Sequence, residues 1–578
     1  MLPISRVDMD KRGWDECDFI FVSGDAYVDH PSFAAALLCR MLESNGFHVG
    51  IIPQPDWKNP ASFTVLGRPR LGFLVGAGNM DSMVAHYTAA KRKRSDDAYS
   101  PGGKSGLRPD RVTLVYVEGI RRAHKDVGNS KITVIIGGIE ASLRRFAHYD
   151  YWSDTVRRSI LLDSKADILV YGMGEKPLLQ IAKRLAAGES INNITDVKGT
   201  CVRVHGKDAV KQWKDAVFLP GYEKVKNKNE VSLRTYAEHF MIQKQNADPL
   251  SAKPLIEEND SDRFVIQNPP ATPLSTKEMD ELYDLPFTRK AHPVYDSAGG
   301  INALKEVSFS LVSSRGCFGG CSFCSITNHQ GRAITGRSKE SLLREIRSLT
   351  KHKDYKGYIH DVGGPTANFF RSACEKQKNG GFCTNRECLY PATCPKLKTD
   401  HSEYLKTLDA LRKVPGVKKV FIRSGLRFDY IQADKKHGKE FLEKLCEHHV
   451  SGQLKVAPEH ISTNVLAAMG KSGSTNGSSY DEFRKDFTAV NKKLGLKQYL
   501  LPYFISAHPG SGIKEAKELA QYLKNTGFAP EQTQEFYPTP GTMSTVMYYT
   551  GLDPRTMSPI YVAKGDKERR KQKELLGK

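Results

Sequence analysis

Short, nearly uninterrupted apolar runs alternate with helical patterns in two long stretches of this chain. In the first stretch the runs lie at 19–25, 46–54, 70–78, 111–119, 132–140 and 166–175, and helix candidates lie at 31–46 and 176–188. Apolar strands that alternate with helices indicate a parallel sheet covered on both faces. The pattern therefore predicts a doubly wound α/β domain, with any ligand at the carboxyl ends of its strands.

The second stretch begins after residue 305 and repeats the pattern. Strand candidates lie at 307–314, 355–364, 417–425, 453–460 and 497–510, and helical spacing marks 338–352, 402–414 and 439–449. This order predicts a full or partial (β/α) barrel with its active site at the carboxyl ends of the strands. Between the stretches, the prolines of NPPATPLS at 268–275 disfavour regular structure, so a partly extended connector is expected there.

Composition narrows the class of protein. The 578 residues include 86 Lys and Arg against 65 Asp and Glu, which gives a net charge of +21. No run of 18 apolar residues is present and the first residues lack an apolar signal segment, so we expect a cytoplasmic protein without membrane contact. The positive charge fits a polyanionic partner and fits solubility equally well. The basic segment 91–111 is predicted to be a surface loop.

The cysteines are the sharpest chemical signal, because seven of the eleven lie between residues 317 and 394. Cys317, Cys321 and Cys324 form a C-x3-C-x2-C array in a glycine-rich loop directly after a strand candidate. Three thiolates on one loop can bind three irons of a [4Fe–4S] cluster and leave the fourth iron open to a small molecule. They could also join a remote ligand around zinc.

A second cysteine group lies on the polar segment 371–398 and consists of Cys374, Cys383, Cys388 and Cys394. Four thiols suffice for a closed site, either an auxiliary iron–sulfur cluster or a structural zinc. Free thiols are the alternative. A segment this polar and glycine-rich favours a metal, because it needs a cross-link to hold its shape.

The sequence around these cysteines is similar to that of a known family. RGCFGGCSFCSITNHQGR at 315–332, DVGGPTAN at 361–368, LKVAPEH at 454–460 and FYPTPGT at 536–542 resemble the YgiQ-type family of radical S-adenosylmethionine (SAM) enzymes. The resemblance covers nearly the whole chain. It implies a Rossmann-like N-terminal domain of the cobalamin-binding type, followed by a radical SAM partial (β/α) barrel. It does not supply a reaction.

The resemblance also implies cofactors and ligands. Cys317, Cys321 and Cys324 would hold the [4Fe–4S] cluster, and its open iron would bind SAM. An electron, from a donor such as flavodoxin or ferredoxin, would then cleave SAM to a 5′-deoxyadenosyl radical that abstracts hydrogen from the substrate.

Further residues correspond to cofactor contacts of the family. Phe323 would pack near the adenine, and Gly363 and Gly364 would present backbone groups to the methionine ammonium. Ser424 or Arg423, together with Glu459, would contact the ribose and the carboxylate. Pro365 replaces the acidic residue that follows these glycines in the family motif, which puts a carboxylate contact at that point in doubt.

Other patterns leave alternatives open. In the first domain His30 follows Asp29 directly, which departs from the D-x-H-x-x-G pattern, so cobalamin binding is not expected. The glycines at 137, 138, 172 and 174 could line a ligand crevice or serve tight turns. His329, Gln330 and Arg332 follow the cysteine loop and could face a substrate.

These observations predict four regions. They are a Rossmann-like domain over 1–200, a connector over 201–302, a radical SAM core over 303–512 with the cysteine-rich insertion 371–398, and a C-terminal extension with a basic tail over 513–578. The predicted function is radical SAM catalysis on an unknown substrate. The basic charge, and the similarity of FYPTPGT to methylthiotransferase tails, point toward RNA or a ribosomal component. The alternative is a non-enzymatic polyanion-binding protein with structural zinc at its cysteines.

Overall fold

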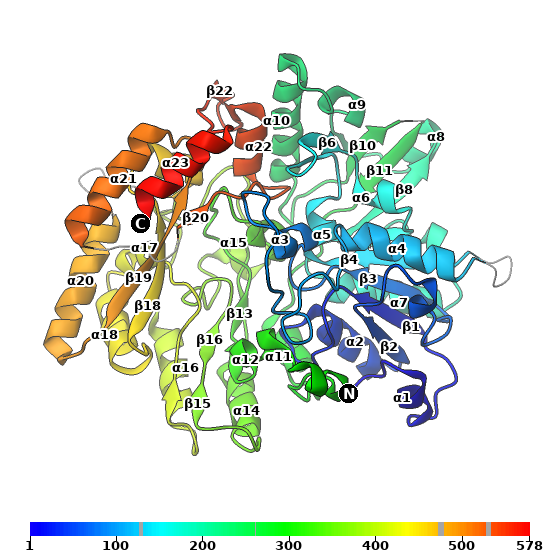
Figure 1. Cartoon of the computed structure of the whole chain (residues 1–578), viewed down its shortest axis with the longest axis horizontal. Coiled ribbons are helices and arrows are strands. Elements are labelled where there is room, and N and C mark those ends of the chain that lie inside the picture. The colour runs from blue at the N-terminus through cyan, green and yellow to red at the C-terminus, as the bar shows by residue number, and fades with distance from the viewer. Residues whose placement is uncertain (126–130, 261, 472–478, 528–532, 578) are drawn as a thin grey trace. The chain divides into compact units, whose positions relative to one another are not determined.

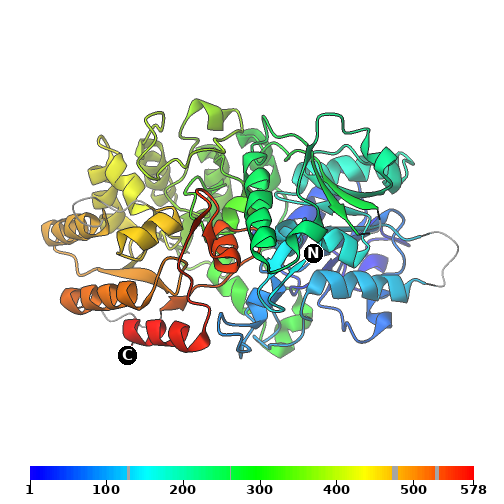
Figure 2. The same cartoon turned by 90° about the horizontal axis from the view of Figure 1, so that it is seen from above.

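The computed structural model describes residues 1–125, 131–260, 262–471, 479–527 and 533–577 (Figures 1 and 2). The chain divides into two compact units. The first comprises 1–272 and 281–308, and the second comprises 273–280 and 309–578. Among the described residues, no helix is both long and apolar enough to cross a membrane.

A nine-stranded mixed sheet forms the centre of the first unit, in the order β2-β1-β3-β4-β7-β8-β11-β10-β9. The first five strands in this order are parallel. Their order, 2-1-3-4-7, is that of a doubly wound fold whose order reverses between β1 and β3, with β5 and β6 forming a separate hairpin. The strands are β1 Phe19–Ser23, β2 Val49–Pro53, β3 Gly72–Gly76, β4 Val134–Gly137, β7 Ile168–Val170, β8 Thr200–His205, β9 Val217–Phe218, β10 Leu255–Asn259 and β11 Arg263–Gln267.

Helices complete the first unit, and a short hairpin of β5 His148–Asp150 and β6 Thr155–Arg157 joins them. Apolar side chains of β1, β3 and β4 pack with those of helix α4 in one core. The helices are α1 Arg6–Asp10, α2 Ala34–Ser44, α3 Ser82–His86, α4 Val112–Ala123, α5 Gly138–Leu143, α6 Ile160–Ser164, α7 Glu175–Ala186, α8 Lys207–Val210, α9 Tyr222–Val225, α10 Glu230–Gln245 and α12 Asn302–Val307. Helix α11, Thr276–Tyr283, lies at the division between the units.

Two expectations for this unit are wrong. The run 111–119, predicted as a strand, is the first part of α4. Its residues Val112, Tyr116 and Ile120 are fully buried at helical spacing, so one face of an apolar helix packs on the sheet. Residues 201–302 are also not merely a connector, because β8, β9, β10 and β11 extend the sheet through them.

Parallel strands follow one another in chain order in the second unit. β12 pairs with β16, β15 with β17, β18 with β19, and β19 with β20, all in parallel. A parallel bridge between Leu426 and Val456 links the segment that follows β17 to β18. This is the strand order of a partial (β/α) barrel. The strands are β12 Ser310–Val312, β15 Tyr358–Ile359, β16 Asp361–Gly363, β17 Lys419–Val420, β18 Gln453–Glu459, β19 Tyr499–Ser506 and β20 Gln534–Glu535.

Helices and two short antiparallel ribbons accompany these strands. The ribbons are β13 Ser314–Arg315 with β14 Thr335–Gly336, and β21 Leu552–Asp553 with β22 Ser558–Pro559. The helices are α13 Ile326–Gln330, α14 Lys339–Leu349, α15 Glu375–Lys378, α16 Ser402–Arg412, α17 Phe428–Ala433, α18 Gly438–His448, α19 Thr463–Met469, α20 Ser479–Leu494, α21 Ile513–Thr526, α22 Met543–Thr550 and α23 Asp566–Leu576.

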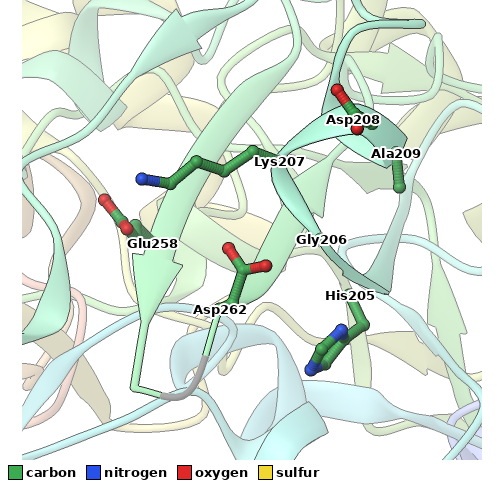
Figure 3. A pocket seen from close by; sticks show the side chains of 7 residues that line it. All are labelled: His205, Gly206, Lys207, Asp208, Ala209, Glu258 and Asp262. Carbon is green, nitrogen blue, oxygen red and sulfur yellow. The ribbon is translucent and has the colours of Figure 1, made fainter.

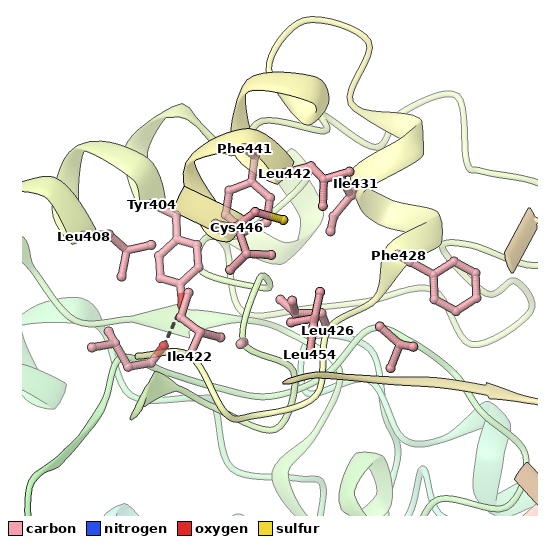
Figure 4. Close-up of a cluster of buried hydrophobic side chains, with 14 of the residues drawn as sticks. Tyr404, Leu408, Ile422, Leu426, Phe428, Ile431, Phe441, Leu442, Cys446 and Leu454 are labelled. Atoms are coloured by element: carbon pink, nitrogen blue, oxygen red, sulfur yellow. Dashed lines mark hydrogen bonds between the residues drawn. The ribbon is translucent and has the colours of Figure 1, made fainter. Parts of the chain in front are cut away.

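The helices of the second unit pack against its strands through one large hydrophobic core (Figure 4). Tyr404 of α16 and Phe441 of α18 pack there, and the hydroxyl of Tyr404 donates to the carbonyl oxygen of Val362 in β16. The parallel array continues past residue 512, where the core was expected to end, because β20 pairs with β19. The basic tail contains helix α23, in which Arg569 is buried and pairs with Glu535.

Candidate functional site

The three cysteines of the C-x3-C-x2-C array lie on one loop between β13 and α13. The ribbon of β13 and β14 brackets this loop, and the N–H of Cys317 donates to the carbonyl oxygen of Gly331 at 3.0 Å across its base. Gly316 has φ +84°, and a Cβ there would lie 2.1 Å from the carbonyl oxygen of Ala333. Only glycine therefore allows the chain to enter the loop this tightly.

An aromatic anchor holds the loop in place. Phe318 is fully buried between two cysteines and stacks on Phe369 with ring centroids 3.7 Å apart, while Tyr430 meets both rings at their edges. Cys317 of the loop packs against this small core, and so do Cys388 and Cys394 of the second cysteine group. The structure thus brings two groups that are separated in sequence to one apolar cluster.

Segments from later in the chain close over the loop. Both backbone groups of Ser322 are satisfied: its N–H donates to Met469 at the end of α19, and its carbonyl oxygen accepts from Ser544 of α22. The side chain of Asn328 donates to the carbonyl oxygen of Gly541 in the FYPTPGT segment. The C-terminal region is consequently part of the wall around the cysteines.

A buried cation contacts the cysteine loop. One terminal nitrogen of Arg427 lies 3.5 Å from the sulfur of Cys321 and 3.2 Å from the carbonyl oxygen of Gly319. The rest of the guanidinium binds both carboxylate oxygens of Asp429. Burial raises the pKa of Cys321, and the charges of Arg427 and Lys471 oppose that rise. The sequence interpretation missed Arg427, although an arginine two residues after a strand candidate was a usable signal.

The thiol pKa values show what the loop needs in order to bind metal. Burial raises the pKa of Cys324 to about 12, against the opposing effect of the backbone N–H groups of Ile326 and Thr327. Buried thiols become thiolates only when cations compensate their charge, and metal ions do this directly.

Within the described ranges, no group of three or more His, Cys, Asp and Glu side chains is gathered closely enough for a metal ion. A cubane makes a different demand, since each cysteine binds its own iron and the sulfurs stand farther apart than around one ion. The donor set, the tight glycine turn and the adjacent cation fit that group.

The predicted glycine pair lies at the end of β16, where there is no room for side chains. A Cβ at Gly364 would lie 2.5 Å from the carbonyl oxygen of Ser314, and one at Gly363 would lie 2.6 Å from the hydroxyl of Ser424. The same Ser424 hydroxyl donates to Asp361, which also accepts from the backbone N–H of Arg423 at 2.8 Å.

Asp361 is a second residue that sequence interpretation missed. Side chains two residues apart point to the same face of a strand, so its carboxylate lies beside Gly363. An acidic residue two positions before the predicted glycine pair was the available signal. The chain thus carries an acidic side chain two residues before the glycines, whereas Pro365 directly follows them.

Glu459 ends β18 and is buried with φ +69°, a conformation that non-glycine residues seldom adopt and that clusters at functional sites. Burial raises the pKa of Glu459, while Lys471, 3.8 Å away, and Arg427 oppose the rise. Phe323 meets the buried ring of His508 edge to face at 6.0 Å between centroids.

The second cysteine group lies around a buried ion pair. Arg332 binds Glu387 at 2.6 Å and donates to the carbonyl oxygens of Cys383 and Arg386. Arg332 therefore holds the cysteine-rich segment in place instead of pointing freely toward a substrate. Cys388 accepts from the side chain of Gln377, and Cys383 is exposed. Burial raises the pKa of Cys388 to about 11; Arg332 opposes the rise, and Cys374 and Cys394 add to it.

The side chain of Arg108 fills the space at the carboxyl ends of β1 and β3 in the first unit. Arg108, from the segment predicted to be a surface loop, is fully buried and bridges Asp25 and Asp97, whereas residues 91–96 of that segment are exposed. Asp25 follows β1, and Arg108 also donates to Ala77, which follows β3. The strand-order reversal between β1 and β3, where doubly wound folds take ligands, is thus occupied by this ion-paired side chain.

Two other features of the first unit bear on ligand binding. His30 is buried and its Nε2 lies 2.9 Å from Arg289. An open pocket with several charged side chains lies beside the end of β8 (Figure 3). Its lining residues are His205, Gly206, Lys207, Asp208, Ala209, Glu258 and Asp262. None of the residues predicted for cofactor binding lies in this pocket.

Comparisons with known proteins identify relatives along the whole chain. Residues 1–310 match the family model described as radical SAM N-terminal, and residues 531–577 match a domain of unknown function, DUF3362. A UPF0313 protein of Clostridium botulinum (strain ATCC 19397 / Type A) is 54% identical over 575 residues, covering 100% of this chain and 86% of the relative. A UPF0313 protein of Clostridium perfringens (strain 13 / Type A) is 52% identical, covering 100% and 84%.

Solved structures that align with this chain include TsrM from Kitasatospora setae, a radical SAM methyltransferase with cobalamin and a [4Fe–4S] cluster bound. It has a TM-score of 0.47 and 13% identity over 91% of this chain and 77% of TsrM. The cobalamin-dependent SAM radical enzyme OxsB has a TM-score of 0.49 and 13% identity, and this chain spans 98% of its own length but 56% of OxsB. On the family match and the full-length relatives, the chain belongs to the UPF0313 family of radical SAM proteins.

Proposed function

We propose that this chain is an enzyme that reductively cleaves SAM at a [4Fe–4S] cluster held by Cys317, Cys321 and Cys324. The observation that carries the proposal is the cysteine loop itself: three cysteines on one tight turn, anchored by Phe318 and touched by the buried cation of Arg427. When bound, the cluster and SAM would supply an electron and the 5′-deoxyadenosyl radical, which is chemistry that no protein side chain provides.

The protein's own residues would bind and orient SAM at the strand ends. Gly363 and Gly364 leave backbone groups accessible where side chains would not fit, and Asp361 adds a carboxylate held in place by Ser424. Glu459 is a buried acid within electrostatic reach of Arg427. Phe323 would offer a ring to the adenine. These contacts position SAM, and the walls formed by α19 and α22 would exclude water from the radical.

Several finer assignments belong to the same proposal. Cys374, Cys383, Cys388 and Cys394 would hold a second iron–sulfur cluster or a zinc ion, since Cys388 and Cys394 pack against the same apolar cluster as Cys317. Zinc would require the thiols to move closer together, because among the described residues they are not gathered around one ion. A flavodoxin or ferredoxin would deliver the electron in the cytoplasm. RNA or a ribosomal component is the proposed substrate class, supported by the net charge of +21.

The test starts from protein purified without oxygen and analysed for iron and sulfide. Reduction in the presence of SAM should yield 5′-deoxyadenosine, measured by liquid chromatography and mass spectrometry. Cys317→Ala, Cys321→Ala and Cys324→Ala should each abolish the product. Cys446→Ala, a buried cysteine in the main core of the second unit, is the matched control and should retain it.

A colourless protein that contains zinc and yields no 5′-deoxyadenosine would refute the proposal and favour the polyanion-binding alternative. Replacing Cys388 and Cys394 together should lower the metal content while the SAM-dependent product remains. Modified nucleosides should be compared in RNA from cells with and without the gene. A nucleoside that is lost without the gene and restored by complementation supports the proposed substrate class.

A further inference from the structure

Arg427 is a buried cation of the second unit that contacts the cysteine loop, and the proposed function does not say what its charge does there. Arg427 lies at the start of α17, and its side chain is 9% exposed. Its guanidinium donates to the sulfur of Cys321 and to the carbonyl oxygen of Gly319, so it contacts the cysteine loop at two points. A buried guanidinium is costly to desolvate, and its partners indicate what it does there.

We propose that Arg427 sets the reduction potential of the cluster by stabilising its reduced state through the sulfur of Cys321. This inference rests on the proposed function, because it requires a cluster at the loop. In this inference Arg427 stabilises the negative charge that the cluster gains on reduction, and it does not contact the substrate.

Arg427 is held in position from two sides. Both oxygens of Asp429 bind one edge of the guanidinium, at 2.8 and 2.5 Å. The buried amide of Asn368 fixes the backbone, because it accepts from the N–H of Arg427 at 3.0 Å and donates to its carbonyl oxygen at 3.1 Å. Asn368 in turn contacts His401, which binds Asp434 at 2.8 Å. The donor is thus pre-organised before any electron arrives.

The chemistry gives the sign of the effect. One-electron reduction of the cluster by the donor protein breaks and forms no bond, and adds one negative charge that spreads over the iron, sulfide and thiolate atoms. A cation donating to a thiolate sulfur stabilises the more negative state, and hydrogen bonds to sulfur are a known determinant of cluster potential. Removing the guanidinium should therefore make reduction harder, whereas removing the carboxylate of Asp429 should make it easier.

The expected size follows from the kind of contact. A charge-assisted hydrogen bond in a buried site changes an equilibrium by about tenfold or more. For a one-electron couple a tenfold change in the reduction equilibrium equals a potential shift of about 59 mV. Arg427→Met should lower the midpoint potential by at least this amount, Arg427→Lys should lower it less, and Asp429→Asn should raise it.

The chain offers a matched control. Arg555 also binds both oxygens of an aspartate two residues away, Asp553, and donates to a backbone carbonyl oxygen, that of Ala467. Arg555→Met removes the same number of atoms and the same kind of ion pair, but no cysteine sulfur. It should leave the midpoint potential unchanged.

The experiment uses the full-length chain, reconstituted without oxygen, with iron counted per chain. The cluster that binds SAM is identified by the change in its electron paramagnetic resonance signal when SAM is added, and that signal is followed through a potentiometric titration. A wild-type midpoint potential in Arg427→Met that carries full iron would overturn the inference and leave the proposed function intact. If Arg427→Met loses its iron, Asp429→Asn decides, since an unchanged or lowered potential there also overturns it. A wild-type chain without a cluster refutes the proposed function, and the inference with it.

Discussion

Gly364→Ala is the change that most directly tests how the strand ends create the site. The added Cβ would lie 2.5 Å from the carbonyl oxygen of Ser314 and 3.2 Å from its carbonyl carbon. These are backbone atoms, so no side-chain rotation relieves the clash, and the backbone of β13 at Ser314 must move away from the residue that directly follows β16. Overpacking of this kind costs about 1–3 kcal/mol.

The control is Gly425→Ala, because a Cβ at Gly425 meets nothing within 4 Å. There alanine should stabilise the chain by about 0.4–1 kcal/mol, through a less flexible unfolded state. The same gain partly offsets the clash at Gly364, so we expect a net loss of about 1–2 kcal/mol for Gly364→Ala. This corresponds to a factor of roughly 5–30 in the equilibrium between closed and open states.

The assay must report on the second unit alone. All four tryptophans, Trp14, Trp57, Trp152 and Trp213, lie in the first unit, so their fluorescence should not change. Native-state hydrogen exchange of peptides covering 309–315 and 358–366 should be roughly 5–30 times faster in Gly364→Ala and no faster in Gly425→Ala. Equal exchange rates in Gly364→Ala and the wild type would refute the steric reasoning. A change in SAM affinity measured on the same samples could then not be attributed to the close approach of Gly364 and Ser314.

Three further outcomes are expected. Arg108→Met leaves Asp25 and Asp97 buried without their partner, so it should destabilise the first unit by about 3–5 kcal/mol in urea unfolding followed by tryptophan fluorescence. Arg92 is exposed, so Arg92→Met should have no effect, and equal urea midpoints for the two variants would contradict the ion-pair assignment. Burial lowers the pKa of His449 to about 4, so below about pH 6.5 the unfolded state gains a proton while the folded imidazole stays neutral. The free energy of unfolding should therefore fall by about 2 kcal/mol between pH 6.5 and 5. In His449→Asn the urea midpoint, measured by circular dichroism, should fall less steeply with pH, and a slope equal to that of the wild type would count against this assignment. Phe318→Ala should cost about 3–5 kcal/mol and lower the iron content, whereas Tyr499→Ala, which is 66% exposed, should do neither; full iron in Phe318→Ala would show that the anchor does not support the loop.

Local sequence patterns predicted much of the architecture correctly. The alternation of apolar runs and helices led to both α/β units, and β1, β2, β3, β4 and β7 lie within predicted strands. The cysteine loop was recognisable because ligands on one turn are neighbours in sequence. The same patterns misassigned 111–119, where a buried helix and a buried strand are both almost continuously apolar, so periodicity over nine residues does not separate them.

Hydrophobic period and cysteine spacing are local properties, so the amino-acid sequence was enough to predict the fold class and to single out the three-cysteine loop. Which distant groups surround that loop depends on the tertiary structure. Arg427 reaches Gly319 across 108 positions, and Phe318 brings Cys388 and Cys394 to the core beneath Cys317. Strands β8 to β11 likewise joined the sheet only through pairing between separate segments. Such contacts depend on how strands and helices pack in space, and the energy of a buried ion pair or a clash at a glycine exists only once that packing is formed.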